Sequence, residues 1–127
     1  MSALLVALGG GAGAVSRYLI GSYVNLVSKS QRIPVAMLIV NIVGAGGLGL
    51  FLGSYYETIS PNLYSCNYYL CFGVGFFGAF TTFSTFSMEA VVLLQKRRYQ
   101  SFMIYIVISL IGCNFAFSMG FLSLAKH

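Results

Sequence analysis

The sequence predicts an all-α integral membrane protein with four transmembrane helices in a single domain over residues 1–127. Hydrophobic residues make up 58% of the 127 residues and charged residues only 7%, against about 25% charged in ordinary soluble domains. The mean hydropathy is +0.87. Four apolar runs, each long enough to cross a bilayer as a helix, occupy nearly all of the chain. A sizeable catalytic domain outside the membrane is therefore excluded.

Polar separators set the limits of the four expected helices. Residues 28–32 are polar and precede Pro34, which suits the first turn of a helix. Residues 57–65 form a turn-forming cluster, and residues 96–98 are a cationic stop. Because backbone groups in hydrocarbon must satisfy their own hydrogen bonds, runs of this length are helices and not open strands. The expected helices cover residues 3–26, 34–56, 66–95 and 101–125.

Glycine is concentrated where helices would touch. Gly9 and Gly13 form one small-xxx-small pair, and Gly49 and Gly53 form another. Such pairs let two helix backbones approach closely in a membrane. We expect close helix contacts at both places, within one chain or between two chains.

The third run contains a hydroxyl-rich segment that favours a break near the middle of the helix. Five hydroxyl side chains lie within residues 81–87, directly after Gly78 and its two following residues. Irregular backbone at membrane depth survives only where it is buried in protein or lines a water-filled or ion-binding cavity. The alternative is that these hydroxyls bond back to carbonyls one turn earlier and that the neighbouring phenylalanines only pack.

Further polar side chains lie inside the second and fourth runs. Asn41 could join helices or offer its amide N–H groups to a ligand. Tyr105, Ser109 and Cys113 recur every four residues and share one helix face. Hydroxyl and amide donors and the positive edges of phenylalanine rings suit a small anion, although hydroxyl oxygens could also coordinate a cation. The pattern predicts a polar pathway without naming the ion.

Two ionisable residues lie within apolar runs. Glu89 is an intramembrane carboxylate, which is a functional candidate by default. Arg17 lies deep in the first run, where its long side chain can extend toward the following loop.

The basic residues are unevenly distributed between the two faces of the membrane. Counted by loop, five Lys and Arg residues in the first and third loops oppose Lys126 on the other face. The positive-inside rule then favours the first and third loops in the cytoplasm. We relate the net charge of +5 to the orientation of the chain in the membrane, and we expect no nucleic-acid partner. The five residues are Lys29, Arg32, Lys96, Arg97 and Arg98.

Enzyme and nucleotide chemistry have little support. The three cysteines lack metal-type spacing, and the single histidine is His127, so no Ser/His/Asp or Cys/His constellation can be assembled. Gly9, Gly11 and Ala14 match the pattern G-x-G-x-x-A, but no strand precedes them and no acidic residue occurs before Glu57. We expect neither an enzyme nor a nucleotide site.

Three segments resemble one known family. Residues 78–89 read G-A-F-T-T-F-S-T-F-S-M-E and resemble the G-G-x-T-T-F-S-T-F-S-x-E signature of the Fluc/CrcB fluoride channels. Residues 9–18 are similar to the first-helix pattern G-G-x-x-G-A-x-x-R-[YW] of the family. Pro34 and residues 40–44 are similar to its second helix. The resemblance covers essentially the whole chain.

The resemblance implies a passive, fluoride-selective channel that exports fluoride from the cytoplasm and protects against its toxicity. It further implies a protein of the cell inner membrane, built in the lipid bilayer as an antiparallel, dual-topology homodimer. Gly78 and Thr81 would hold a structural sodium ion at the dimer axis through backbone carbonyls, and Arg17 and Glu89 would lie near the vestibules. The fluoride pathway would comprise Phe83, Phe86, Asn41, Ser84, Thr85, Tyr105 and Ser109.

This chain departs from the family pattern in three ways. Met37 stands where many members have Thr, and Cys113 replaces a family-typical Ser with a weaker donor. The basic loops are also unbalanced for a chain that inserts in both orientations, so a heterodimer with a homologue of opposite topology is an alternative to the favoured homodimer.

Two other functions remain as alternatives. A small proton-coupled multidrug exporter would need a carboxylate, and within the runs only Glu89 could serve. A non-transporting membrane scaffold would pass no ion.

Overall fold

The computed structural model describes residues 2–28, 33–55 and 66–125, and these are almost entirely helical. The segment η3 is a π-helix, in which hydrogen bonds close over five residues and not four. The elements are α1 (Ser2–Val27), α2 (Val35–Ser54), η3 (Tyr69–Phe77), α3 (Gly78–Phe80), α4 (Phe83–Gln95) and α5 (Tyr99–Leu124).

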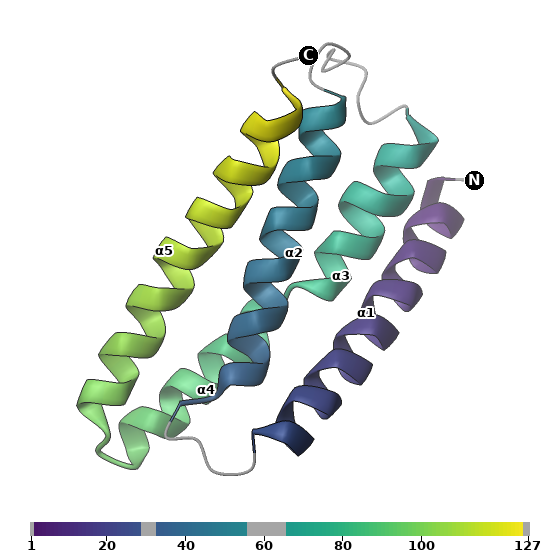
Figure 1. The fold of residues 1–127 in the computed structure, drawn as a ribbon. Helices are drawn as coiled ribbons and strands as arrows, with labels where there is room; N and C mark the ends of the chain where they lie inside the picture. The colour runs from purple at the N-terminus through teal and green to yellow at the C-terminus, as the bar shows by residue number, and fades with distance from the viewer. Residues whose placement is uncertain (1, 29–32, 56–65, 126–127) are drawn as a thin grey trace.

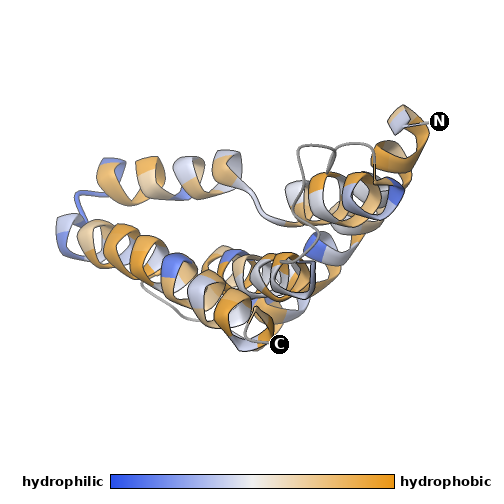
Figure 2. Ribbon diagram, turned by 90° about the horizontal axis from the view of Figure 1, so that it is seen from above, coloured by the Kyte–Doolittle hydropathy of each residue, from blue (hydrophilic) through white to orange (hydrophobic). Residues whose placement is uncertain are grey.

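Four helical segments are long and apolar enough to cross a membrane: α1, α2, the segment Tyr69–Gln95, and α5. The start of α1 and the ends of α2 and α5 lie at one end of the bundle, and the α4–α5 turn lies at the other (Figure 1). Figure 2 shows hydrophobic residues around all of the helices and a hydrophilic stretch at the α4–α5 turn. For the described residues, the prediction of an all-helical protein with four helices long and apolar enough to span a membrane is confirmed.

The cationic stop after the third run is a tight helix-ending turn. Arg97 N–H donates to Leu94 O at 2.9 Å, and Arg98 N–H donates to Leu93 O at 3.0 Å. This pair of bonds is the Schellman motif, whose left-handed position usually carries glycine. Here Arg97 occupies it with φ 55°. Because the turn is so short, α5 begins at Tyr99, two residues before the expected start.

Glycine pairs bring the helices into backbone contact. A Cβ atom added at Gly9 or Gly13 of α1 would collide with backbone carbonyls of η3. One added at Gly49 or Gly53 of α2 would collide with backbone carbonyls of α5. The close contacts expected from both small-xxx-small pairs are therefore present, and they lie within one chain.

Little of the described chain is buried. Exposed large apolar side chains lie along the lengths of α1 and α5. Such surfaces suit hydrocarbon or another helix, since lipid tails are as apolar as a leucine side chain. Among the described residues, the buried hydrophobic side chains are Ala36, Val40, Phe80, Ala90, Leu93 and Tyr105.

Candidate functional site

The third span is interrupted between α3 and α4. Helix α3 ends at Phe80, and α4 begins at Phe83. Between them Thr81 (φ −77°, ψ 151°) and Thr82 (φ −144°, ψ 118°) have extended backbone. Figure 1 shows that α4 then follows a different direction from α3. Two residues therefore leave the helical backbone conformation within a 27-residue apolar span, although the Thr81 N–H still donates to Phe77 O at 3.1 Å.

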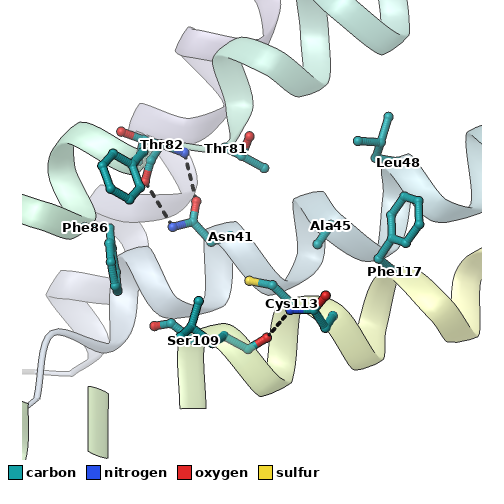
Figure 3. A pocket seen from close by; sticks show the side chains of 12 residues that line it. Asn41, Ala45, Leu48, Thr81, Thr82, Phe86, Ser109, Cys113 and Phe117 are labelled. Atoms are coloured by element: carbon teal, nitrogen blue, oxygen red, sulfur yellow. Dashed lines mark hydrogen bonds between the residues drawn. The ribbon is translucent and has the colours of Figure 1, made fainter. Parts of the chain in front are cut away.

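Asn41 of α2 holds this extended segment by its backbone. The Thr82 N–H donates to Asn41 Oδ1 at 2.9 Å, and Asn41 Nδ2 donates to Thr82 O at 3.1 Å. Figure 3 shows this reciprocal pair. Since unpaired backbone groups are costly away from water, the Asn41 side chain here replaces the helical bond that the Thr82 N–H does not make. An amide nitrogen carries two N–H groups, and Thr82 O accepts from one of them.

The Thr82 hydroxyl begins α4. Its oxygen accepts from the Thr85 N–H at 3.2 Å, which makes Thr82 the N-cap of the helix. The same hydroxyl donates to Thr85 Oγ1 at 3.1 Å and lies 3.2 Å from Ser84 Oγ. Thr82 is 6% exposed. Ser84 and Thr85 therefore join a hydroxyl cluster centred on Thr82.

The other two hydroxyls of the segment follow the alternative considered from the sequence. Thr81 Oγ1 donates to Phe77 O at 2.9 Å, and Ser87 Oγ donates to Phe83 O at 2.8 Å. Both bonds run back one helical turn, as Ser and Thr side chains commonly do in helices. The hydroxyls at the two ends of the segment thus bond to backbone carbonyls of the preceding turn, whereas those at its centre form a separate cluster around Thr82.

Because the N–H groups of Thr82 and Thr85 bond to side chains, two backbone carbonyls lose their usual helical donors. In an α-helix the N–H of residue i+4 bonds the carbonyl of residue i. The Thr82 N–H, which would pair with Gly78 O, bonds Asn41. The Thr85 N–H, which would pair with Thr81 O, bonds the Thr82 hydroxyl. Gly78 and Thr81 are the residues expected from the sequence to hold sodium.

A groove of about 440 Å³ lies beside the interruption, between α2, α4 and α5. Figure 3 shows side chains from these elements converging on it. Its apolar lining includes Phe83, Phe86 and Phe117. None of the described residues that line it is Asp or Glu. Its polar lining comes from Asn41, Thr81, Thr82, Ser109, Cys113 and Asn114.

One polar atom at the groove has no partner within the described part of the chain. Ser109 Oγ is buried and unpaired, and the residue is 6% exposed. By contrast, Asn114 Nδ2 donates to Leu110 O at 2.8 Å. A buried unpaired hydroxyl costs about 1 to 3 kcal/mol. Ser109 therefore marks a place where a ligand or water would gain a hydrogen bond.

Three aromatic rings form a row along α4 and α5. The rings of Phe83 and Phe86 are 6.0 Å apart between centroids and tilted by 41°, and Phe86 stacks on Tyr105 at 5.2 Å. Phe83 is 81% exposed, whereas Tyr105 is fully buried. The row therefore runs from the surface of this chain into its interior.

Tyr105 and Glu89 form a second polar pair. Tyr105 donates its hydroxyl hydrogen to Glu89 Oε2 at 2.7 Å. Glu89 also lines a separate cavity of about 280 Å³ near the α4–α5 turn, together with Lys96 and Arg98. Tyr105 does not line the groove, and Arg17 on α1 is half-buried away from it.

The structure brings five of the eleven candidate residues together at the groove. Asn41, Thr81, Phe83, Phe86 and Ser109 line the groove. Ser84 and Thr85 contact the Thr82 hydroxyl but do not line the groove. Gly78, Tyr105, Glu89 and Arg17 do not line it either. Sequence reasoning missed the central role of Thr82, although a threonine directly before a helix is a recognised N-cap signal.

These features define a multi-pass helical membrane protein with a neutral, polar groove beside an interrupted span. The family described as CrcB-like protein, Camphor Resistance (CrcB), matches residues 4–121. The chain belongs to this family.

Similar proteins cover nearly the same length. The chain is 46% identical over 121 residues to fluoride-specific ion channel FluC 1 of Halalkalibacterium halodurans, with 95% of both chains covered. It is 40% identical over 118 residues to fluoride-specific ion channel FluC 2 of Bacillus thuringiensis subsp. konkukian, with 92% of both covered. Fluoride-specific ion channel FluC of Hahella chejuensis is 44% identical over 117 residues, which cover 91% of this chain and 87% of that protein.

Proposed function

We propose that this chain is a passive, fluoride-selective channel that exports fluoride from the cytoplasm across the cell inner membrane and so protects against fluoride toxicity. The observation that carries the proposal is the 46% identity to a fluoride-specific ion channel over 95% of both chains. The neutral, polar groove beside Thr81 and Thr82 also supports the proposal.

The chemistry of the groove supports a small anion. Ser109 has a buried unpaired hydroxyl, and Asn41 has a second amide N–H. Both can replace water around an anion, and the positive ring edges of Phe83 and Phe86 can face it. The described lining contains no carboxylate that would repel an anion.

The same lining supports passive conduction over proton coupling. A coupled exporter needs a titratable group that meets the substrate. The chain has two acidic residues. Glu57 lies outside the described residues, and Glu89 is bonded to Tyr105 away from the groove.

We propose further that the working unit is an antiparallel, dual-topology homodimer. Phe83 is 81% exposed although it lines the groove. A second copy would cover this ring and complete the wall of the groove. Lys96 to Arg98 lie at one end of the bundle, so an antiparallel pair would present one cationic turn on each side of the membrane. Lys29, Arg32 and Lys126, which complete the five-to-one count, lie outside the described residues.

A structural sodium ion at the dimer axis fits the carbonyls of Gly78 and Thr81. Carbonyl oxygens suit hard cations, and the helical donors of both carbonyls are bonded elsewhere. Gly78 is exposed and has open space where a side chain would begin. When bound there, sodium would supply a fixed positive charge that offsets part of the cost of an anion in low dielectric.

Fluoride efflux from liposomes that contain only the purified protein tests the proposal. The liposomes are loaded with potassium fluoride or potassium chloride, valinomycin starts the flux, and ion-selective electrodes record both anions. Rapid loss of fluoride without loss of chloride supports a passive selective channel formed by one gene product. Flux that depends on a pH gradient and disappears in Glu89→Gln would instead indicate a coupled exporter.

No loss of either ion calls for co-reconstitution with a homologue of opposite topology. Flux restored by that partner would identify a heterodimer. No flux even then would leave a scaffold that transports nothing, and the channel proposal would be wrong.

A further inference from the structure

Cys113 places a thiol in the wall of the groove. The residue lies on α5 one helical turn after Ser109, about 6 Å along the helix axis. It is half-buried and in the free thiol form. Figure 3 shows its sulfur pointing from α5 toward Asn41 of α2. The thiol therefore lies between the two helices that border the groove.

A second observation is that this part of the groove contains a buried polar atom with no hydrogen-bond partner among the described residues. Ser109 Oγ lines the same groove, is buried and has no hydrogen-bond partner among the described residues. The groove encloses about 440 Å³ next to both side chains. A group attached to Cys113 Sγ thus has space to occupy and an oxygen donor one turn away.

We propose that the groove is a binding site for soft, thiol-seeking metal ions, anchored on Cys113 Sγ with Ser109 Oγ as a weaker second donor, and that its occupation blocks conduction. The effect on conduction rests on the channel function proposed above. Thiolate sulfur is the one soft ligand among the polar groups that line the groove; the others are hydroxyls and amides, which favour hard ions.

The reaction with methylmercury chloride is a simple ligand exchange. The Cys113 S–H bond loses its proton to buffer, the thiolate sulfur forms a bond to mercury, and chloride leaves. Nothing is oxidised or reduced. The reagent is neutral and small, so it can enter a groove lined by uncharged side chains. The adduct fills space between α2 and α5 and removes the S–H donor. Excess dithiothreitol exchanges the mercury away and restores the thiol.

Two further cysteines provide matched controls. Cys66 precedes η3 and Cys71 lies within it, and neither lines the groove. Fluoride efflux is measured before and after methylmercury chloride in four proteins, each normalised to its own untreated rate. They are the wild type, Cys66→Ser/Cys71→Ser, Cys113→Ser and Cys113→Ala. Intact-protein mass spectrometry counts the adducts in each sample.

We expect the wild type and Cys66→Ser/Cys71→Ser to lose most of their fluoride flux on labelling and to regain it with dithiothreitol. Both Cys113 variants should keep their untreated rates. Inhibition that persists in the Cys113 variants, an adduct at Cys113 without loss of flux, or no adduct at Cys113 would each overturn the proposal. If the channel function itself is wrong, the untreated protein passes no fluoride, a result distinct from all of these.

Discussion

Replacing Asn41 tests whether one amide side chain holds the interrupted span in place. In Asn41→Leu the side chain keeps a similar size but can neither accept from the Thr82 N–H nor donate to Thr82 O, the two bonds of 2.9 and 3.1 Å. The Thr82 N–H is then left without a partner, which costs about 1 to 3 kcal/mol, whereas Thr82 O, as the N-cap carbonyl, still accepts the first bond of α4. With about 1 kcal/mol for the second lost hydrogen bond, we expect a loss of about 2 to 4 kcal/mol in the free energy of unfolding.

Asn41→Asp separates this structural role from the electrostatics of conduction. The carboxylate still accepts from the Thr82 N–H, but it faces Thr82 O without a hydrogen to donate. The expected loss is therefore smaller, about 1 kcal/mol for one lost hydrogen bond. Fluoride conduction should nevertheless be blocked, because a negative charge then stands beside the proposed anion path.

The assays are denaturant unfolding in detergent and fluoride efflux from liposomes, at matched protein content. Asn114→Leu is the control for unfolding, since Asn114 bonds a carbonyl of its own helix and no backbone of the interrupted segment. An Asn41→Leu protein that unfolds like the wild type would refute the reasoning about Thr82. Normal fluoride flux in Asn41→Asp would remove Asn41 from the pathway.

Three further predictions concern the aromatic row, the thiol and the turn. Phe83→Ile or Phe86→Ile should sharply reduce fluoride efflux without unfolding the protein, because aliphatic side chains have no positive ring edge; Phe72→Ile on η3 is the control, and wild-type flux in both variants would contradict the pore assignment. Cys113→Ser should be tolerated or slightly raise fluoride flux, since a hydroxyl is the better donor, and a complete loss would show that the thiol is needed. Arg97→Gly should raise the thermal midpoint in detergent by relieving about 1 kcal/mol of left-handed backbone strain, and an unchanged or lower midpoint would count against that strain.

The spans could be predicted because hydrocarbon constrains composition directly. A long apolar run in hydrocarbon must form all of its backbone hydrogen bonds within itself, and a helix does this. The four segments of the structure follow the four runs. The π-helical form of η3 could not be predicted, because nothing in residues 69–77 distinguishes bonding over five residues from bonding over four.

Side-chain partners were harder to predict than positions. A spacing of four correctly groups Tyr105, Ser109 and Cys113 on one face of α5, but it does not specify what that face meets. Tyr105 stacks on Phe86 and bonds Glu89, whereas Ser109 and Cys113 line the groove. The bond between Asn41 and Thr82 joins residues 41 apart in sequence, and only the packing of α2 beside the third span brings them together.

The small core has a consequence for every measurement on this protein. Ordinary domains owe their folding free energy to side chains removed from solvent, yet the described part of this chain buries few. Its folded state therefore depends on what covers its outer surface, whether lipid, detergent or a second copy. Binding that favours the folded state adds to stability through mass action, so the apparent stability rises with the concentration of the partner. The apparent free energy of unfolding therefore falls when the covering lipid, detergent or second copy is diluted. Variants of this chain are comparable only at equal ratios of protein to detergent or lipid.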